Sequence, residues 1–141
     1  MIALASDHAG YELKEAIKKY LFDKNVDIMD FGTNSTASVD YPVYGKKAAR
    51  AVTSGQCDKG IVCCGTGIGI SIAANKVPGI RCALLHNEFE ATMAKRHNNA
   101  NMVAFGARVL DTETALKLVD IWLNESFEEG RHQRRVDMIE E

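Results

Sequence analysis

Short apolar runs alternate with amphipathic stretches along the chain, and this alternation limits the possible folds more than any other feature of the sequence. The runs that predict strands are residues 1–6, 27–31, 59–64, 81–85 and 101–105. Between them apolar residues recur with helical spacing, first at Leu13, Ile17, Tyr20 and Leu21, then within 41–54, 67–75, 88–96 and 112–123. A last helix is expected to begin near Arg131, after Gly130.

Repeated strand–helix units predict an α/β fold. We expect a three-layer sandwich, in which a five-stranded parallel sheet lies between two layers of helices. The chain has 141 residues and no repeat or linker, so residues 1–141 are expected to form a single domain. Right-handed crossovers bring the carboxyl ends of all strands to one edge of such a sheet, and ligands bind there.

Composition excludes several kinds of partner. A net charge of −2 gives no general attraction to nucleic acid or to anionic membranes. No apolar run is long enough for a membrane span, and no signal peptide is recognisable. The four cysteines lack the spacing of metal fingers, and the four histidines are scattered, so no metal site is expected. Free thiols in a reducing cytoplasm are the expected state.

Residues 60–71 carry the strongest chemical signal. An apolar run ends in two cysteines and passes into the turn Gly65-Thr-Gly-Ile-Gly69, which then opens a helix. Glycines let the backbone approach a ligand, and free N–H groups at a helix start attract anions. The turn lacks the lysine of a P-loop, and Ile70 replaces the third glycine of a dinucleotide site, which argues against nucleotides. We interpret it as a cradle for an oxyanion or phosphate, with a purely structural tight turn as the alternative.

Cys64 stands directly before this turn. A thiol at a helix N-terminus loses its proton more easily than a free cysteine, which makes Cys64 a candidate base or nucleophile. Thr66 can hydrogen-bond the same substrate. Cys63 should point to the opposite face of the strand and pack there. The alternative for Cys64 is a small core residue.

Two further pairs of polar residues follow elements of the predicted fold. Asp7 and His8 come directly after the first strand and are expected to point toward the glycine turn, although a helix cap and a loop residue would explain them equally well. His97 and Asn98 end the fourth helix, where a histidine is favoured by the helix dipole whatever its role. We expect Asn98 and Arg108 to lie near one edge with His97, which would make His97 an oriented proton donor.

The start of the last helix is basic. Arg131 and Arg135 are four residues apart and so share a helix face, which suits a phosphate group. A solvated basic face is the alternative. Too few basic residues are contiguous for a nucleic-acid surface.

Taken together, these motifs resemble the ribose-5-phosphate isomerase B family, which also includes the subunits of galactose-6-phosphate isomerase. The matching segments run in order over nearly the whole chain: Ser6-Asp-His-Ala-Gly10, Asp40-Tyr-Pro42, Cys64-Gly-Thr-Gly-Ile-Gly-Ile-Ser-Ile-Ala-Ala-Asn-Lys76, Arg96-His-Asn98, Phe105-Gly-Ala-Arg108 and Gly130-Arg-His-Gln-Arg-Arg-Val136.

The resemblance implies a Rossmann-like fold and a homodimer or pair of dimers. It also implies an isomerase that interconverts ribose 5-phosphate and ribulose 5-phosphate without metal or cofactor. Cys64 matches the proton-abstracting base, and His97, supplied by the partner chain, matches the acid that opens the sugar ring, while Thr66 lies in the catalytic turn. Matched substrate-contacting positions are Asp7, His8, Tyr41, Gly65, Gly67, Ile68, Gly69, Asn98, Arg108, Arg131 and Arg135.

Three other functions stay open at this point. The same family includes isomerases of six-carbon sugars such as allose 6-phosphate or galactose 6-phosphate. A non-catalytic module that binds sugar phosphates would use the same scaffold, although Cys64 and His97 are both present. A nucleotide-binding protein is the weakest alternative, because both phosphate-loop signatures are missing.

Overall fold

The computed structural model describes residues 1–141 and contains the strands and helices in the predicted order. The strands are β1 (Ile2–Ser6), β2 (Ile28–Asp30), β3 (Lys59–Cys64), β4 (Cys82–Leu84) and β5 (Met102–Gly106). The helices are α1 (Tyr11–Asp23), α2 (Tyr41–Thr53), α3 (Ile68–Asn75), α4 (Glu88–Arg96), α5 (Thr112–Asn124) and α6 (Arg131–Ile139). No helix is both long and apolar enough to cross a membrane.

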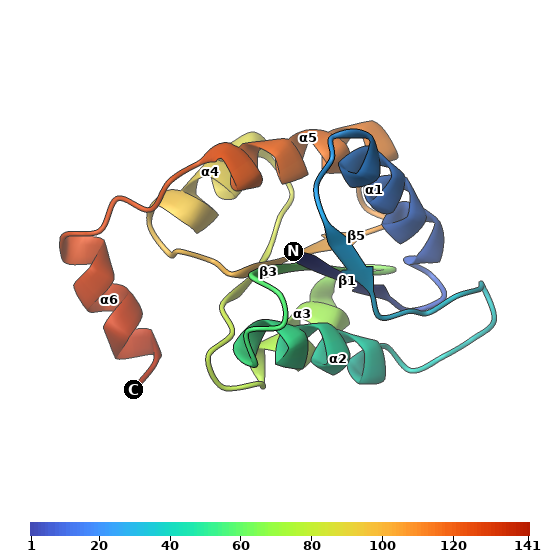
Figure 1. Ribbon diagram of the computed structural model, residues 1–141, viewed down its shortest axis with the longest axis horizontal. Helices are drawn as coiled ribbons and strands as arrows, with labels where there is room; N and C mark the ends of the chain where they lie inside the picture. The colour runs from blue at the N-terminus through green and yellow to red at the C-terminus, as the bar shows by residue number, and fades with distance from the viewer.

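All strands are parallel and form one sheet in the order β2-β1-β3-β5-β4. Helices α1, α4 and α5 cover one face of this sheet, and α2 and α3 cover the other (Figure 1). The predicted three-layer α/β sandwich is therefore confirmed, and the fold is Rossmann-like. Strands in such a sheet are buried on both faces, which explains why they read as continuous apolar runs.

Strand β3 shows how the two faces are divided. Ile61 and Cys63 belong to the apolar cluster under α1, α4 and α5, whereas Val62 and Cys64 belong to the cluster under α2 and α3. The prediction that Cys63 faces away from Cys64 and packs is thus confirmed. Burial raises the pKa of the Cys63 thiol far above its ordinary value, so this sulfur stays protonated.

The last helix lies apart from both layers. Figure 1 shows α6 at one end of the molecule, and only His132 and Val136 of this helix are buried. Its carboxyl end is held by an ion pair of 2.7 Å between Glu140 and Arg81, the residue before β4. This arrangement leaves Arg131 and Arg135 exposed on α6.

Candidate active site

The glycine turn lies at the topological switch point of the sheet, between β1 and β3, where the strand order reverses. Strands β1 and β3 are neighbours, with Ser6 opposite Cys63, yet the chain leaves β1 toward one face and β3 toward the other. Such a switch point opens a crevice at the carboxyl edge of a parallel sheet, and ligands bind in that crevice. The segments that meet there are the ones after β1 and β3, and the N–H of Asp7 donates to the Cys63 carbonyl at 3.2 Å.

Close packing explains the glycines of this turn. Gly67 has φ of +78°, and a Cβ there would lie 2.5 Å from Leu84 Cδ1 and 2.8 Å from the Phe105 carbonyl carbon. A Cβ on Gly106, in β5, would lie 2.4 Å from the Thr66 carbonyl oxygen. The turn is therefore pressed against the ends of β4 and β5, and only glycine fits at positions 67 and 106.

Cys64 points its sulfur into this turn. The residue is 5% exposed, and its Sγ accepts a hydrogen bond of 3.1 Å from the Gly67 N–H. The neighbouring N–H groups of Gly65 and Thr66 donate no hydrogen bond within the chain. A shielded thiol and unpaired amides are thus side by side at the start of α3, where a helix attracts negative charge. This arrangement can move a proton and stabilise an oxyanion at neighbouring atoms.

Two polar side chains flank the turn. The Arg108 guanidinium lies over Gly65, since a Cβ on that glycine would be 3.2 Å from Nη1, and the Arg108 N–H donates to the Gly65 carbonyl at 2.9 Å. The Tyr41 ring lies over Gly69, where a Cβ would be 2.6 Å from the ring and 3.0 Å from Oη. Thr66 Oγ1 accepts from the Ile68 N–H at 3.1 Å.

Asp7 and His8 both hydrogen-bond to the backbone, as expected if they are a helix cap and a loop residue, the structural alternative given above. The Asp7 side chain is buried, and its Oδ1 accepts from the Gly10 N–H at 2.9 Å. His8 Nδ1 accepts from the Val39 N–H at 3.1 Å, which places the proton of the neutral ring on Nε2. We call the Cys64–Gly69 turn, with Asp7, His8, Tyr41 and Arg108, the thiol half-site.

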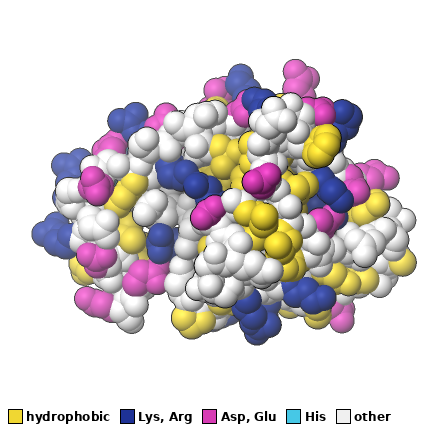
Figure 2. All heavy atoms as spheres, viewed as in Figure 1, with side chains coloured by type: hydrophobic (Ala, Val, Ile, Leu, Met, Phe, Trp, Pro, Cys, Tyr) yellow, Lys and Arg dark blue, Asp and Glu magenta, His cyan; other side chains and the backbone are white.

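One spatial prediction is wrong for the single chain. Arg108 follows β5 at the carboxyl edge of the sheet, whereas His97 and Asn98 follow α4, which runs back to the amino edge. The predicted grouping failed because the end of a crossover helix lies opposite the ends of the strands. Arg131 and Arg135 on α6 also lie at this amino-edge end, where Figure 2 shows basic side chains among acidic ones. We call His97, Asn98, Arg131 and Arg135 the histidine half-site.

A histidine pair in this half-site was not predicted. The rings of His97 and His132 stack with centroids 4.0 Å apart and planes 10° from parallel. Both Nε2 atoms face Oε1 of Glu128, at 3.7 Å for His97 and 3.5 Å for His132. Glu128 precedes the Gly130 break before α6, so no periodic pattern in the sequence links these residues.

The surroundings of this pair shift the pKa values of Glu128 and His132. A hydrogen bond from Arg96 holds the pKa of the Glu128 carboxyl below its usual range. Burial, followed by the nearby charge of His97, lowers the pKa of His132. Glu128 is therefore ionised at neutral pH, and His132 favours its neutral form.

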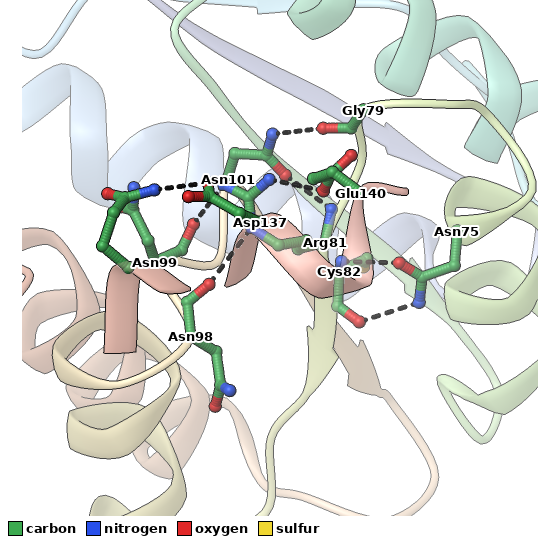
Figure 3. A network of polar contacts seen from close by, with 10 residues as sticks. Asn75, Gly79, Arg81, Cys82, Asn98, Asn99, Asn101, Asp137 and Glu140 are labelled. Carbon is green, nitrogen blue, oxygen red and sulfur yellow. Dashed lines mark hydrogen bonds and ion pairs between the residues drawn. The ribbon is translucent and has the colours of Figure 1, made fainter. Parts of the chain in front are cut away.

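Arg81 connects the parts of the histidine half-site (Figure 3). Its guanidinium donates to the carbonyls of Asn98 and Asn99, at 3.1 and 2.8 Å, in addition to the ion pair with Glu140. The turn after α4 and the end of α6 are thus bound to one side chain. Arg81 stands in an apolar run of the sequence, and nothing in its spacing signals this role.

Known proteins of similar sequence and structure allow a family assignment. The family described as Ribose/Galactose Isomerase matches residues 2–139. The ribose-5-phosphate isomerase B of Escherichia coli is 46% identical over 138 residues, which cover 98% of this chain and 93% of that protein. A putative sugar phosphate isomerase of Bacillus subtilis is 45% identical over 139 residues, covering 98% of this chain and 93% of that protein.

Solved structures of similar fold are also ribose-5-phosphate isomerases B. The ribose-5-phosphate isomerase B of Clostridium thermocellum superposes with a TM-score of 0.98 at 52% identity, over 99% of this chain and 94% of that one. The enzyme of Mycoplasma genitalium, solved with bound ribulose-5-phosphate, superposes with a TM-score of 0.94 at 41% identity, over 99% of this chain and 93% of that one. The fold described above is therefore shared with solved ribose-5-phosphate isomerases B. The chain belongs to the ribose/galactose isomerase family.

Proposed function

We propose that this protein is an aldose–ketose isomerase that interconverts D-ribose 5-phosphate and D-ribulose 5-phosphate through an enediolate, a reaction of the non-oxidative pentose phosphate pathway. The observation that carries the proposal is the Cys64 thiol beside the unpaired amides of Gly65 and Thr66 at the switch point of the sheet. Relatives at 46% and 41% identity are named for this reaction, which supports the same substrate here.

In the proposed mechanism Cys64 acts as thiolate. It removes the proton from C2 of the open-chain aldose, and the electron pair moves onto the C1 oxygen to give the enediolate. The hydroxyl proton on O2 then passes to O1, which leaves the negative charge on O2. Return of the proton from sulfur to C1 forms the C2 carbonyl of the ketose and regenerates the thiolate. Backbone N–H donors aimed at the developing oxyanion are worth about 3–4 kcal/mol each in comparable sites, and Gly65 and Thr66 are positioned for this role.

The remaining residues bind the substrate or open its ring. Because most of the pentose is cyclic, an acid must first open the furanose, and His97 has this role in our proposal. Arg108, Arg131 and Arg135 offer guanidinium groups to the phosphate, whose remote binding energy helps to position the reacting carbons. Asp7, His8, Tyr41, Thr66, Asn98 and the turn residues Gly65 to Gly69 complete the sugar contacts.

A complete site requires a second copy of the chain in this proposal. The thiol and histidine half-sites lie at opposite edges of one sheet, so neither reaches the other within a chain. Exposed apolar side chains at the start of α2 and along α3, namely Tyr41, Val43, Ile68 and Ile72, offer a surface for association. A homodimer or a pair of dimers would join the thiol half-site of one protomer to the histidine half-site of its partner.

Mixing two inactive variants tests the shared site. Cys64→Ala and His97→Ala each damage every site of a homodimer. When equal amounts are unfolded and refolded together, half of the dimers are mixed, and each mixed dimer has one intact site. About a quarter of wild-type activity should therefore return for a two-fold symmetric dimer. No recovery by a mixture in which mixed dimers are detected would place both groups in one chain.

The substrate test uses purified protein and a chelator. With EDTA present, ribose 5-phosphate, allose 6-phosphate and galactose 6-phosphate are each supplied, and ketose formation is followed. We expect conversion of ribose 5-phosphate at the highest kcat/KM. Preference for a six-carbon substrate would assign the chain to another activity of the family, and binding without conversion would indicate a non-catalytic module.

We also propose a cytoplasmic location. All of the cysteines, Cys57, Cys63, Cys64 and Cys82, are free, as expected for thiols in a reducing compartment. Fractionation of cells that produce the protein tests this, and recovery outside the cytoplasmic fraction would contradict it.

A further inference from the structure

His97, Glu128 and His132 form a group of metal-ligating side chains at the edge of the sheet opposite Cys64. One ligand atom from each lies within 4.8 Å of the other two. We propose that this group is an inhibitory binding site for a divalent transition-metal ion of the Zn²⁺ type.

The donor set fits such an ion. Two imidazole nitrogens and one carboxylate oxygen are characteristic Zn²⁺ ligands, and an open fourth position is common in such sites. With metal–ligand bonds of about 2.0–2.1 Å, tetrahedral donors lie about 3.4 Å apart. The separations from Glu128 Oε1 are 3.5 Å to His132 Nε2 and 3.7 Å to His97 Nε2, so the carboxylate needs to move only slightly.

Glu128 is already oriented for this role. Its Oε2 accepts a hydrogen bond of 2.7 Å from Arg96 Nε, while its Oε1 faces both histidines. Its backbone N–H donates to the Arg96 carbonyl at 3.0 Å. Partners of this kind fix a metal-binding carboxylate and are usual around ligands.

One ring must turn on binding. The lone pair of each Nε2 lies in the plane of its ring. Because the two ring planes are stacked and nearly parallel, the lone pairs cannot converge on one ion as they stand. The His97 side chain is 38% exposed and can turn, whereas that of His132 is 9% exposed and is held. The nearby cations Arg96 and Arg131 oppose a further positive charge, so we expect reversible binding that a chelator removes.

Inhibition follows if His97 opens the sugar ring, and this part rests on the proposed function. A metal ion on Nε2 excludes a proton from that nitrogen and holds the ring against Glu128. The metal site itself does not depend on the reaction.

The test begins with chelator-treated protein titrated with ZnCl₂. Calorimetry should show one ion per chain, and turnover of ribose 5-phosphate should fall over the same range and recover with EDTA. His132→Ala should weaken Zn²⁺ binding by at least about tenfold, because losing a metal ligand costs no less than losing a residue that hydrogen-bonds to a ligand. Zn²⁺ concentrations that inhibit the wild type should therefore not inhibit this variant. Glu128→Gln tests the third ligand without removing a ring.

His86→Ala is the matched control. His86 Nδ1 lies 3.1 Å from Glu90 Oε1 on the surface, so it forms a pair of one histidine and one carboxylate without a third ligand. This variant should bind Zn²⁺ and be inhibited as wild type is.

Two results would overturn the proposal. One is a wild-type protein that binds no Zn²⁺ in the titration. The other is Zn²⁺ binding and inhibition that persist in both His132→Ala and Glu128→Gln, which would place the metal elsewhere, with the Cys64 thiol the first candidate. Zn²⁺ binding that depends on His132, in a protein that converts no ribose 5-phosphate, would support the metal site and refute the proposed function.

Discussion

Replacement of Asp30 by Asn should destabilise the protein strongly, because Asp30 neutralises a buried ammonium. The Lys14 side chain is only 1% exposed, and its Nζ lies 2.7 Å from Asp30 Oδ2. Lys18 Nζ lies 3.0 Å from the same oxygen, and the Gly32 N–H donates to Oδ1 at 2.9 Å. Asp30 thus joins α1 to the turn that follows β2.

The size of the effect follows from burial. Removing one partner of a buried pair costs about 3–5 kcal/mol. Glu15 stays 3.0 Å from Lys14, and Asp30 is partly exposed, so we expect the lower end, about 3 kcal/mol. At about 3 °C per kcal/mol for a chain of this size, Tm should fall by about 9 °C. The Gly32 carbonyl accepts the Ser6 N–H at 2.8 Å, so the loosened turn adjoins Asp7 in the thiol half-site.

Urea unfolding at pH 7, followed by the fluorescence of the single buried Trp122, measures this loss. Asp23→Asn is the control, since the Asp23–Lys19 pair has the same chemistry at 2.7 Å but side chains 56% and 76% exposed. It should change the free energy of unfolding by less than about 0.5 kcal/mol. Equal small losses for Asp30→Asn and Asp23→Asn would refute the argument from burial.

The same pair predicts a pH dependence. Burial alone would raise the pKa of Asp30, but hydrogen bonds from Lys14, Gly32 and Lys18 outweigh it and hold the pKa below its usual value. A carboxyl with a depressed native pKa stabilises the fold above its unfolded pKa of about 4, and loses this contribution as pH falls through the native value. The difference between wild type and Asp30→Asn should therefore be full at pH 7 and shrink below about pH 4.

Three shorter predictions concern the half-sites. Gly67→Ala should lower the free energy of unfolding by at least about 1–3 kcal/mol and abolish most of the activity, because the new Cβ would meet Leu84 and φ at this position is positive. An unchanged urea midpoint together with unchanged turnover would contradict this. Arg135→Ala should raise KM for ribose 5-phosphate with kcat largely retained, and an unchanged KM would argue against a phosphate contact. Arg81→Ala should speed amide hydrogen exchange across α6 and leave β3 protected, because it removes the ion pair with Glu140; equal exchange in both proteins would count against its anchoring role.

The fold was predictable because its strands are buried on both faces and its helices on one. Those two environments leave different apolar periods in the sequence, which is why the order of elements and the opposite burial of Cys63 and Cys64 came out correctly. The thiol half-site was predictable for a related reason. Each of its segments follows a strand of the sheet or opens a helix beside it, and parallel topology brings them to one edge.

The histidine half-site was not predictable in the same way. His97 ends a helix, so topology sends it to the far edge, away from Arg108. Its stacking on His132 depends on how α6 docks, and that docking is fixed by the contacts of Arg81 and Glu128 rather than by any period in the sequence. Tertiary hydrogen bonds between distant segments leave no local pattern to read.

The central claim is that the sulfur of Cys64 carries the proton of the isomerisation. Comparison of Cys64→Ala with wild type, with kcat and the free energy of unfolding measured on the same preparations, tests it most directly. Loss of a general base should lower kcat by about 10²–10⁴-fold. Loss of the hydrogen bond from Gly67 to the sulfur should cost only about 1 kcal/mol of stability. A stable Cys64→Ala protein that turns over ribose 5-phosphate at the wild-type rate would contradict the claim.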